Sequence, residues 1–543
     1  MLPAATRAPR FIALVVFVLL AVVHTWPLAR DPVHQSRNDS SDALLNTWAI
    51  AWVAHQLPRD PAHLFDANIF APERHTLGYS EAMIVQGVLA MPILAAGGSP
   101  TLAYNLVLIA GFVFTGWAFF LLLQAWTGSL AAGYVAGSLA AFNAHSLVRL
   151  THLQAQHVEF IPITLFALDR IVKARRVRDA IWLAIGFALQ ALTSVYLLVF
   201  STWMLIFAAL GRSRESFRQS PMAVVGLLVL AGAIATALLF PYLSAYYTLH
   251  ATTGFARRAD EATFFAASWA NFLSTPGRLH YSAWSAPYMR TATSSTFPGL
   301  VATLLAVTAM VWRDTRRDPR VQMCLTALAG CLVISILPRL PAYSVLHDRI
   351  PLFSAVRVPA HMGQVVLLLL AVVAGFAVAG LQRRWGATRQ WAAIAVGLVL
   401  LVNLEALRAP VGYTADEGIS GIYDELGAMD TGAVAEFPFP QPTMGALNAP
   451  YMLNSTRHWW PLLNGYSGFQ PASYRDTYDA INHFPDDASL IALHTRGVTH
   501  VVVHFKAQFN ERSVGKDTFD AIERSASLHR VAQRGDIYIY RLK

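Results

Sequence analysis

Long apolar runs separated by short basic clusters constrain this chain more than any other feature. Only 13% of its 543 residues are charged and 55% are hydrophobic, which excludes an ordinary soluble protein. The sequence therefore predicts a mainly α-helical, polytopic membrane protein with about eleven transmembrane helices. Runs long enough to cross about 30 Å of hydrocarbon lie at 11–29, 101–124, 130–148, 157–172, 179–194, 195–211, 221–242, 297–313, 321–337, 361–380 and 388–408.

The first run has the composition of either a signal peptide or a first transmembrane span, because Arg7 and Arg10 precede it. We interpret it as an uncleaved span. Its apolar part is long for a signal peptide, no clear small-x-small cleavage site follows it, and many spans come later.

The basic clusters predict the topology. They lie at 173–178, 211–218, 313–320 and 382–389, and alternation from a cytoplasmic N-terminus places all four inside, as the positive-inside rule requires. The apolar run at 82–98 would reverse the later parity if it crossed, so we interpret it as an interfacial or re-entrant element on the outer side. This parity places five polar segments outside: 30–100, 149–156, 243–296, 338–360 and the tail from 409.

The tail has the hydropathy of a soluble domain. Segments 432–439, 498–505 and 536–542 have the β-branched or aromatic composition of strands. Residues 486–497 read as a helix that ends at Gly497. We therefore predict two domains, a transmembrane domain at 1–408 and a small extracytoplasmic α/β domain at 409–543.

Several function classes lack support in the sequence. The net charge is +9, but Lys and Arg lie between apolar runs rather than on one stripe, so no nucleic-acid partner is predicted. There is no GxxxxGK[ST] loop for ATP and no HExxH motif. Cys324 and Cys331 share one apolar run, and His145, His152 and His157 lack an acid or cysteine at metal-ligand spacing. The sequence indicates no metal and no other cofactor.

The first outer loop carries the main candidate for catalysis. Leu45, Trp48 and Trp52 fall at helical spacing on one side, which predicts an amphipathic helix at the membrane surface with its indoles at headgroup level. Asp42 stands directly before the first turn. It caps the helix through its carboxylate, acts as a general base at the mouth of the membrane domain, or does both. Asp39, three residues earlier, is the weaker candidate.

Seven segments occur in an order that resembles a known group of proteins. They are "SDALLNTWAIAWVAHQL" (41–57), "LFDANIFAPERHTLGYSE" (64–81), "AYNL" (103–106), "HLQAQHVEFIPITLFALDR" (152–170), "TFPGL" (296–300), "PLFSAVRVPAHMG" (351–363) and "YMLNSTRHWWPLLNGYSGFQP" (451–471). Together with the topology, they resemble bacterial membrane proteins of the C-type glycosyltransferase (GT-C) superfamily, with a YfhO-like branch as the nearest group.

This resemblance implies eleven or more spans, a key acid in the first outer loop and a sugar donor carried on a polyprenyl phosphate. Asp42 matches that acid, and Asp39 is a possible second one. The chain departs from the pattern at two places. Ser41 and Ala43 replace the Gly and Pro expected around the acid, and His361 stands where an "RVPxR" pattern has its second Arg.

A lipid-phosphate donor leaves as an anion, so its site needs a base for the acceptor hydroxyl and cations for the phosphate. Asp42 would supply the base. Arg357 would bind the phosphate, with Arg339 and Arg349 in reserve, because guanidinium geometry suits phosphate oxygens. Each arginine has the alternative role of pairing with lipid headgroups. A single displacement of this kind inverts the anomeric centre.

Three further residues and one tail segment have two readings each. His152 and Glu159 stand at the outer start of a span, where they either bind sugar hydroxyls or cap the helix. Glu81 either faces the cavity or anchors an interfacial turn. The "HWW" segment at 458–460 either stacks on sugar rings or packs in the core of the tail.

The prediction is a glycosyltransferase of the bacterial inner (plasma) membrane that acts on the extracytoplasmic face. Its partners would be a polyprenyl-phosphate sugar donor, membrane lipids and a glycan, lipid or protein acceptor of the cell envelope. The alternatives are a transporter or lipid flippase, and a non-catalytic protein of envelope assembly. Asp169 and Glu405 lie close to span ends and no internal repeat is evident, which argues against transport.

Overall fold

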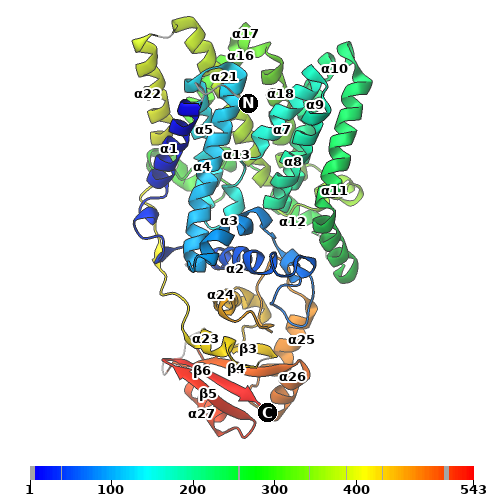
Figure 1. Cartoon of the computed structure of the whole chain (residues 1–543), viewed down its shortest axis with the longest axis vertical. Coiled ribbons are helices and arrows are strands. Elements are labelled where there is room, and N and C mark those ends of the chain that lie inside the picture. Colours follow the sequence, from blue (N-terminus) through cyan, green and yellow to red (C-terminus); the bar gives the residue numbers. More distant parts are fainter. Residues whose placement is uncertain are drawn as a thin grey trace. The chain divides into compact units, whose positions relative to one another are not determined.

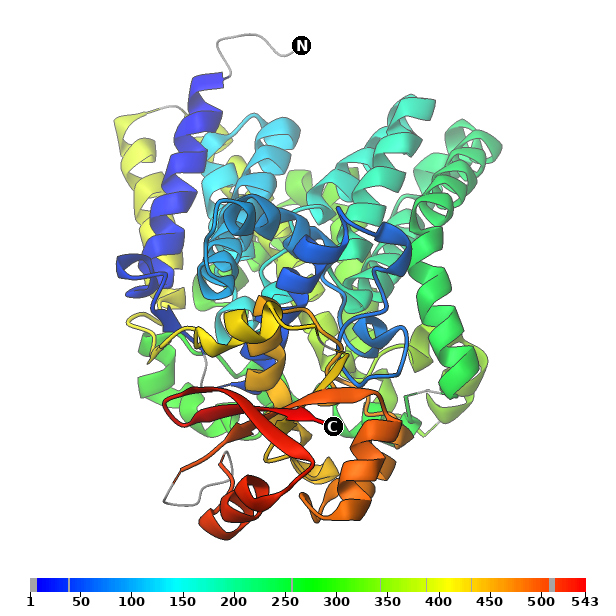
Figure 2. The same ribbon diagram turned by 60° about the horizontal axis from the view of Figure 1, so that its bottom comes forward.

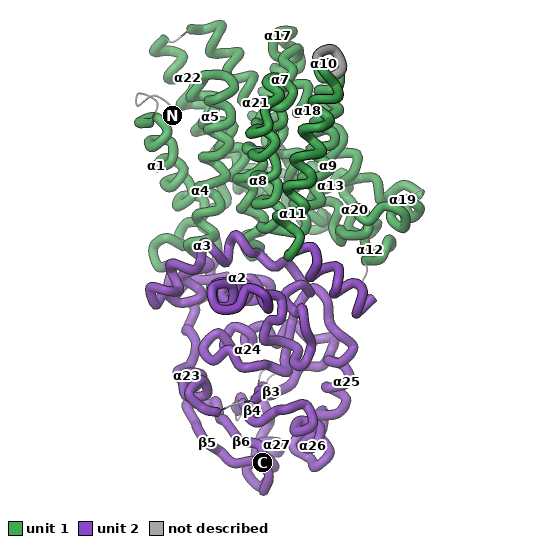
Figure 3. Tube along the Cα trace, turned by 45° about the vertical axis from the view of Figure 1, so that its right-hand side comes forward, with its two compact units in different colours: residues 1–31, 106–242, 256–412 green, residues 32–105, 243–255, 413–543 purple. Residues whose placement is uncertain are grey.

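The computed structural model describes residues 7–37, 40–254, 257–341, 343–386, 388–430, 432–506 and 513–543. Figure 3 shows the two compact units into which the chain divides. Unit 1 comprises residues 1–31, 106–242 and 256–412, and unit 2 comprises residues 32–105, 243–255 and 413–543. The C-terminal segment thus belongs to the same unit as the first loop.

Every predicted span overlaps a helix of the structure (Figure 1). Residues 130–148 cover two helices, and each of the other ten runs lies mainly on one helix. The helices concerned are α1 (Arg7–His24), α4 (Pro100–Thr127), α5 (Leu130–Ala141), α6 (Ala144–Val148), α7 (Ile161–Ala174), α8 (Val177–Thr193), α9 (Val195–Gly211), α11 (Pro221–Thr253), α16 (Leu300–Val311), α18 (Pro319–Ile336), α21 (Gly363–Trp385) and α22 (Arg389–Ala406).

Within the described residues, six helical segments are long and apolar enough to cross a membrane, so the chain is a membrane protein. Shorter helices such as the 12-residue α16 reach only about 18 Å at about 1.5 Å per residue. The count of about eleven crossings therefore remains a prediction. The six segments are Arg7–His24, Pro100–Thr127, Pro221–Thr253, Pro319–Arg339, Pro359–Trp385 and Arg389–Ala406.

Helix α21 forms the core of unit 1, since it is buried along most of its length and packs against α5, α16 and α18. Its sequence is apolar on all sides, which is typical of a helix surrounded by other helices. Small residues allow helices to approach closely in this core. A Cβ added at Gly375 of α21 would lie 2.9 Å from Leu123 of α4, and one at Gly137 of α5 would lie 2.4 Å from the carbonyl oxygen of Gly116 of α4.

The four basic clusters gather at one end of unit 1. Figure 1 shows α10 (Ser213–Gln219) and α17 (Arg313–Arg316) at this upper end. The guanidinium of Arg384 lies 3.7 Å from the ring centroid of Trp312, next to α17. This common end is the arrangement that the positive-inside prediction requires. We call it the basic end.

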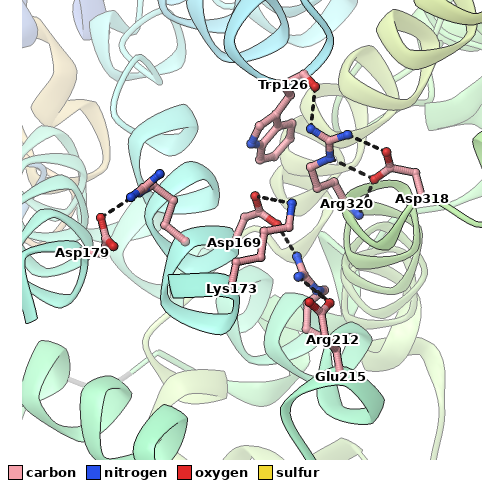
Figure 4. Close-up of polar contacts among 9 residues, drawn as sticks. Trp126, Asp169, Lys173, Asp179, Arg212, Glu215, Asp318 and Arg320 are labelled. Carbon is pink, nitrogen blue, oxygen red and sulfur yellow. Dashed lines mark hydrogen bonds and ion pairs between the residues drawn. The ribbon is translucent and has the colours of Figure 1, made fainter. Parts of the chain in front are cut away.

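Ion pairs tie the helices together at the basic end (Figure 4). Arg212 is only 1% exposed and donates to Asp169 of α7 and to Glu215, the latter at 2.6 Å. Lys173 adds a second cation 3.1 Å from Asp169. A buried guanidinium is stable only when its charge is paired and its donors are used, so these acids are structural partners of Arg212.

Helix α2 (Ser41–Gln56) of unit 2 is not the amphipathic surface helix that we predicted. Ala43 to Ala54 are all buried, and the indole N–H groups bond to protein atoms. Trp48 donates to Asn68 Oδ1 at 3.2 Å, and Trp52 donates to the carbonyl oxygen of Leu64 at 2.8 Å. The prediction counted one apolar side, but the segment is apolar nearly all round, which is typical of a buried helix.

Residues 82–98 form the 12-residue helix α3 (Ile84–Ala95), which is too short to cross a membrane at about 1.5 Å per residue. It packs against α2 in the same unit. At their contact a Cβ added at Gly87 would lie 2.4 Å from Val53, so only glycine allows this spacing. The interpretation of this segment as an interfacial or re-entrant element stays a prediction.

Backbone hydrogen bonds join the first loop to the C-terminal segment in unit 2. Strand β1 (Gln35–Ser36) pairs antiparallel with β2 (Thr414–Ala415). The backbone N–H of Phe70 donates to Asn464 at 3.1 Å, and that of Leu462 donates to Asn68 at 2.8 Å. These bonds explain why segments far apart in the sequence form one unit.

A four-stranded sheet in the order β3-β4-β6-β5 forms the C-terminal part of unit 2 (Figure 2). The predicted strands are confirmed as β3 (Ala433–Phe437), β4 (Val498–His504) and β6 (Ile537–Leu542), and the predicted helix as α26 (Asp487–Thr495). We did not predict β5 (Leu528–Arg534), which is largely exposed and polar. Unit 2 also contains α23 (Ile422–Gly427), α24 (Ala449–Asn454), α25 (Ala472–Ile481) and α27 (Lys516–Arg524).

The buried His458 makes unit 2 sensitive to acid. Burial lowers the pKa of His458 from 6.5 to about 4. Between these two pH values His458 is therefore protonated in the unfolded chain but neutral in the folded chain. Stability falls as the pH drops through this window, by about 2 kcal/mol near pH 5.

A substitution isolates this contribution. The Nδ1 atom of His458 accepts from the backbone N–H of Trp460 at 3.0 Å, and His458→Asn retains an acceptor. The midpoint temperature of thermal unfolding is measured for the full chain in detergent at neutral pH and at about pH 5. This temperature should fall less between the two pH values in His458→Asn than in the wild type. Equal losses in both proteins would contradict this prediction.

Candidate functional site

Asp42 lies in the first turn of α2, one residue inside the helix, while Ser40 occupies the N-cap position. The hydroxyl of Tyr466 donates to Asp42 Oδ1 at 2.8 Å. This hydrogen bond and the positive end of the helix dipole both favour the charged carboxylate. The C-terminal segment thus orients the acid of the first loop. Sequence reasoning missed Tyr466, although it lies within the quoted segment 451–471.

The first loop contains two further candidate acids, Asp39 and Glu81. Asp39 lies outside the described residues. Glu81 lies in unit 2 between the short helix η4 (Thr76–Tyr79) and α3, and it is half-buried.

A group of basic and aromatic side chains gathers in unit 1 where α9 and the segment before α21 begin. The Nη1 atom of Arg149 donates to His361 Nε2 at 3.1 Å. The ring of His361 lies 5.1 Å from that of His145 and 5.7 Å from that of Tyr196. Ser294 Oγ lies 2.8 Å from His145 Nδ1. We call these five residues the Arg149 cluster.

The hydrogen bond fixes the state of His361. A guanidinium can only donate, so His361 Nε2 must accept and the imidazole is neutral with its proton on Nδ1. The charge of the pair therefore sits on Arg149, which is half-buried. Residue 361 is a histidine where the RVPxR pattern has an arginine. The guanidinium of Arg149 nevertheless lies within hydrogen-bond distance of this position.

The Arg149 cluster and the basic end lie at opposite ends of the same helices. Tyr196 stands in the first turn of α9 and His361 just before α21, whereas the basic clusters follow the C-terminal ends of these two helices. Sequence reasoning missed Arg149, because it follows a short helix in a run that we assigned to a single span. The only signal was the departure at His361.

The predicted arginines have different surroundings. Arg357 is exposed and donates to Glu261 Oε1 at 2.6 Å, with its guanidinium 5.2 Å from the ring centroid of Phe265. Arg339 donates to the backbone carbonyl of Ala267 at 2.7 Å and to that of Ala266 at 3.0 Å. Arg349 is exposed at the end of α19 (Tyr343–Arg349). These contacts show that Arg357 and Arg339 already have protein partners.

His152 and Glu159 lie in the segment between α6 and α7. His152 Nδ1 is 2.8 Å from Thr151 Oγ1, and His152 stands at the N-terminal edge of a short helical turn. Glu159 Oε1 is 2.9 Å from Nδ1 of the buried His157, whose Nε2 lies 3.0 Å from the carbonyl oxygen of Val107. Glu159 therefore has a structural partner within its own segment.

No family model matches the chain, and no curated protein matches it. Solved structures do match. The arabinofuranosyltransferase AftD from Mycobacteria is 13% identical, with a TM-score of 0.62, over 99% of this chain and 40% of AftD. ArnT from Cupriavidus metallidurans is 12% identical, with a TM-score of 0.49, over 98% of this chain and 97% of ArnT. This chain therefore spans less than half of AftD, with which it shares a fold.

Proposed function

We propose that this protein is a membrane glycosyltransferase of the GT-C type. The observation that carries the proposal is the fold shared with the arabinofuranosyltransferase AftD over 99% of the chain. The order of the sequence motifs, which resembles that of GT-C proteins, is a second and independent support. The two are independent because the structural match to AftD is a match of fold, with only 13% sequence identity. The donor would be a sugar on a polyprenyl phosphate and the acceptor a glycan, lipid or protein of the cell envelope.

The proposed reaction is a single displacement. Asp42 takes the proton of an acceptor hydroxyl, whose oxygen forms a bond to the anomeric carbon of the sugar. The bond between that carbon and the phosphate oxygen breaks, and the polyprenyl phosphate leaves with the electron pair. The anomeric centre is inverted, since the acceptor attacks opposite to the departing phosphate. The hydroxyl of Tyr466 donates to Asp42 Oδ1 and so favours the charged carboxylate.

Arg149 is the proposed main contact of the departing phosphate, because guanidinium donors stabilise the charge that develops on phosphate oxygens. It takes the role that the resemblance gives to an arginine at residue 361. Arg357 would add a second contact by exchanging Glu261 for the phosphate. Arg339 and Arg349 remain the proposed reserve contacts of the phosphate. Asp39 remains the second proposed catalytic acid, and Glu81, His152 and Glu159 remain proposed substrate contacts.

The proposed location is the bacterial inner membrane, in the manner of YfhO-like proteins. The basic end of unit 1 faces the cytoplasm in this arrangement, together with the N-terminus. The Arg149 cluster, the first loop and the domain at 409–543 then lie on the extracytoplasmic side. This side is where a lipid-linked donor and an envelope acceptor meet.

The structure gives two acids near span ends ordinary roles, which weakens the transport alternative. Asp169 pairs with Arg212 and Lys173. Glu405 accepts from the backbone N–H of Val301 in the first turn of α16, at 3.2 Å, and so caps that helix. Neither acid behaves as an intramembrane ion site.

Comparative mass spectrometry of envelope glycans and lipid-linked sugars tests the proposal. Cells without the gene should lose one glycan product and accumulate one polyprenyl-phosphate sugar. The wild-type gene should restore both, whereas the gene for Asp42→Asn should restore neither. Unchanged glycans and lipid-linked sugars in all strains would overturn the proposal.

A further inference from the structure

A cavity of about 600 Å³ lies within unit 2 beside the C-terminal half of α2. Its volume is in the range of small-molecule sites, about 300 to 1,000 Å³. His55 of this cavity is roughly 20 Å along the axis of α2 from Asp42, at about 1.5 Å per residue. The cavity is therefore separate from the Asp42 carboxylate. Polar and aromatic residues that line it are His55, Arg59, Ser99, Thr456, Arg457 and Trp459.

An aromatic pair forms one wall of the cavity. The rings of His55 and Trp459 stack with their centroids 4.3 Å apart and their planes 25° apart. Trp52 supports Trp459 edge-on at 5.7 Å. Burial and the neighbouring Arg59 lower the pKa of His55 to about 4, so this ring is neutral at neutral pH. The outer face of this stack is a flat, uncharged surface of the kind on which a sugar ring stacks.

The backbone of Trp459 is held in an unfavourable conformation. Its φ of 59° lies in the left-handed region, which a bulky side chain seldom adopts. A 2.7 Å hydrogen bond from its N–H to the carbonyl oxygen of Ser455 holds this turn in place. The half-buried indole is thereby fixed at the cavity wall rather than packed in the core.

The charges that line the cavity are positive. Arg59 uses one donor on the carbonyl oxygen of His55 at 2.7 Å, which leaves its other donors for a ligand. Among the described residues, Arg457 pairs with Asp424 at 3.8 Å, and both side chains of this pair are largely exposed. The described residues that line the cavity include two arginines and no carboxylate. Ser99 adds the N-terminal end of α4, where its hydroxyl accepts from the N–H of Leu102 at 3.1 Å.

We propose that this cavity binds an anionic saccharide that forms part of the acceptor. A sugar ring would lie against Trp459 and His55, and its carboxylate or phosphate group would bind Arg59 and Arg457. This identification of the acceptor class rests on the proposed function. Because the cavity is roughly 20 Å from Asp42, the acceptor would be an oligosaccharide that reaches from one end of α2 to the other.

Calorimetric titration of the purified full chain in detergent tests the proposal, with tetragalacturonate as the anionic probe and cellotetraose as the neutral one. Tetragalacturonate should bind the wild type at least tenfold more tightly than cellotetraose does. The double variant Arg59→Gln/Arg457→Gln should lose at least tenfold in affinity, and Trp459→Ala should lose a similar factor. The exposed Arg74→Gln and Trp269→Ala serve as matched controls with unchanged binding.

Other outcomes separate this proposal from the proposed function. Asp42→Asn should bind tetragalacturonate as the wild type does, so lost transfer with retained binding supports both assignments. Equal binding by the wild type and the double arginine variant would overturn the saccharide site, whatever the transfer activity. Phosphatidylglycerol vesicles that bind with the same arginine dependence, while tetragalacturonate does not, would show a lipid site and also overturn it.

Discussion

Asp42→Asn should abolish sugar transfer while leaving the folded protein intact. Loss of a general base typically costs about 10²- to 10⁴-fold in rate, and an amide cannot take the proton of the acceptor hydroxyl. The asparagine oxygen still accepts the hydrogen bond that Tyr466 donates at 2.8 Å. The measurement is transfer from a lipid-linked sugar in membranes that contain equal amounts of each variant.

Two variants complete this experiment. Asp476→Asn removes an exposed carboxylate in the same unit and should leave transfer unchanged. Tyr466→Phe should lower transfer by about tenfold, because it removes a single hydrogen bond worth about 1.4 kcal/mol to the acid. If Asp42→Asn transferred sugar at the wild-type rate, Asp42 would be a structural residue of the first turn of α2.

Arg149→Gln should reduce transfer by about 100-fold, which corresponds to the loss of about 3 kcal/mol of phosphate stabilisation. The loss should appear mainly in kcat if Arg149 binds the departing phosphate more tightly than the intact donor. The matched control is Arg317→Gln, an exposed arginine near the basic end of unit 1. Steady-state kinetics with a polyprenyl-phosphate sugar provide the measurement.

A second-site change makes this prediction sharper. Arg149 Nη1 and His361 Nε2 are 3.1 Å apart, so an arginine at residue 361 would bring a guanidinium to the same place. The double variant Arg149→Gln/His361→Arg should transfer sugar at least tenfold faster than Arg149→Gln alone. A double variant as inactive as Arg149→Gln alone, or a fully active Arg149→Gln, would contradict the assignment of the phosphate contact.

The positions of the helices could be predicted from the sequence, because apolar run length and basic clusters depend on composition alone. All eleven runs overlap helices, and the basic clusters share one end of unit 1. The surroundings of α2 could not be predicted, since they depend on contacts distant in sequence. Trp48 and Trp52 looked like interfacial indoles, yet they bond to Asn68 and Leu64.

In the candidate site, too, local signals could be predicted from the sequence and contacts between distant segments could not. Asp42 could be named as a candidate from its place in the first loop, because an acid at the start of an apolar helix is a local signal. Tyr466 and Arg149 could not, because each acts through a partner far away in the sequence, Asp42 and His361 respectively. The strand β5 was missed for a simpler reason, because its exposed, polar residues lack the strand pattern.

The release of polyprenyl phosphate from a polyprenyl-phosphate sugar tests the central claim most directly. The purified chain would be reconstituted in liposomes with the labelled donor and an extract of envelope glycans, and the lipid product would be followed by mass spectrometry. We predict release and matched glycan labelling with the wild type and with Asp476→Asn, and neither with Asp42→Asn. Release at equal rates from wild type and Asp42→Asn, or from neither, would contradict a glycosyltransferase that uses Asp42.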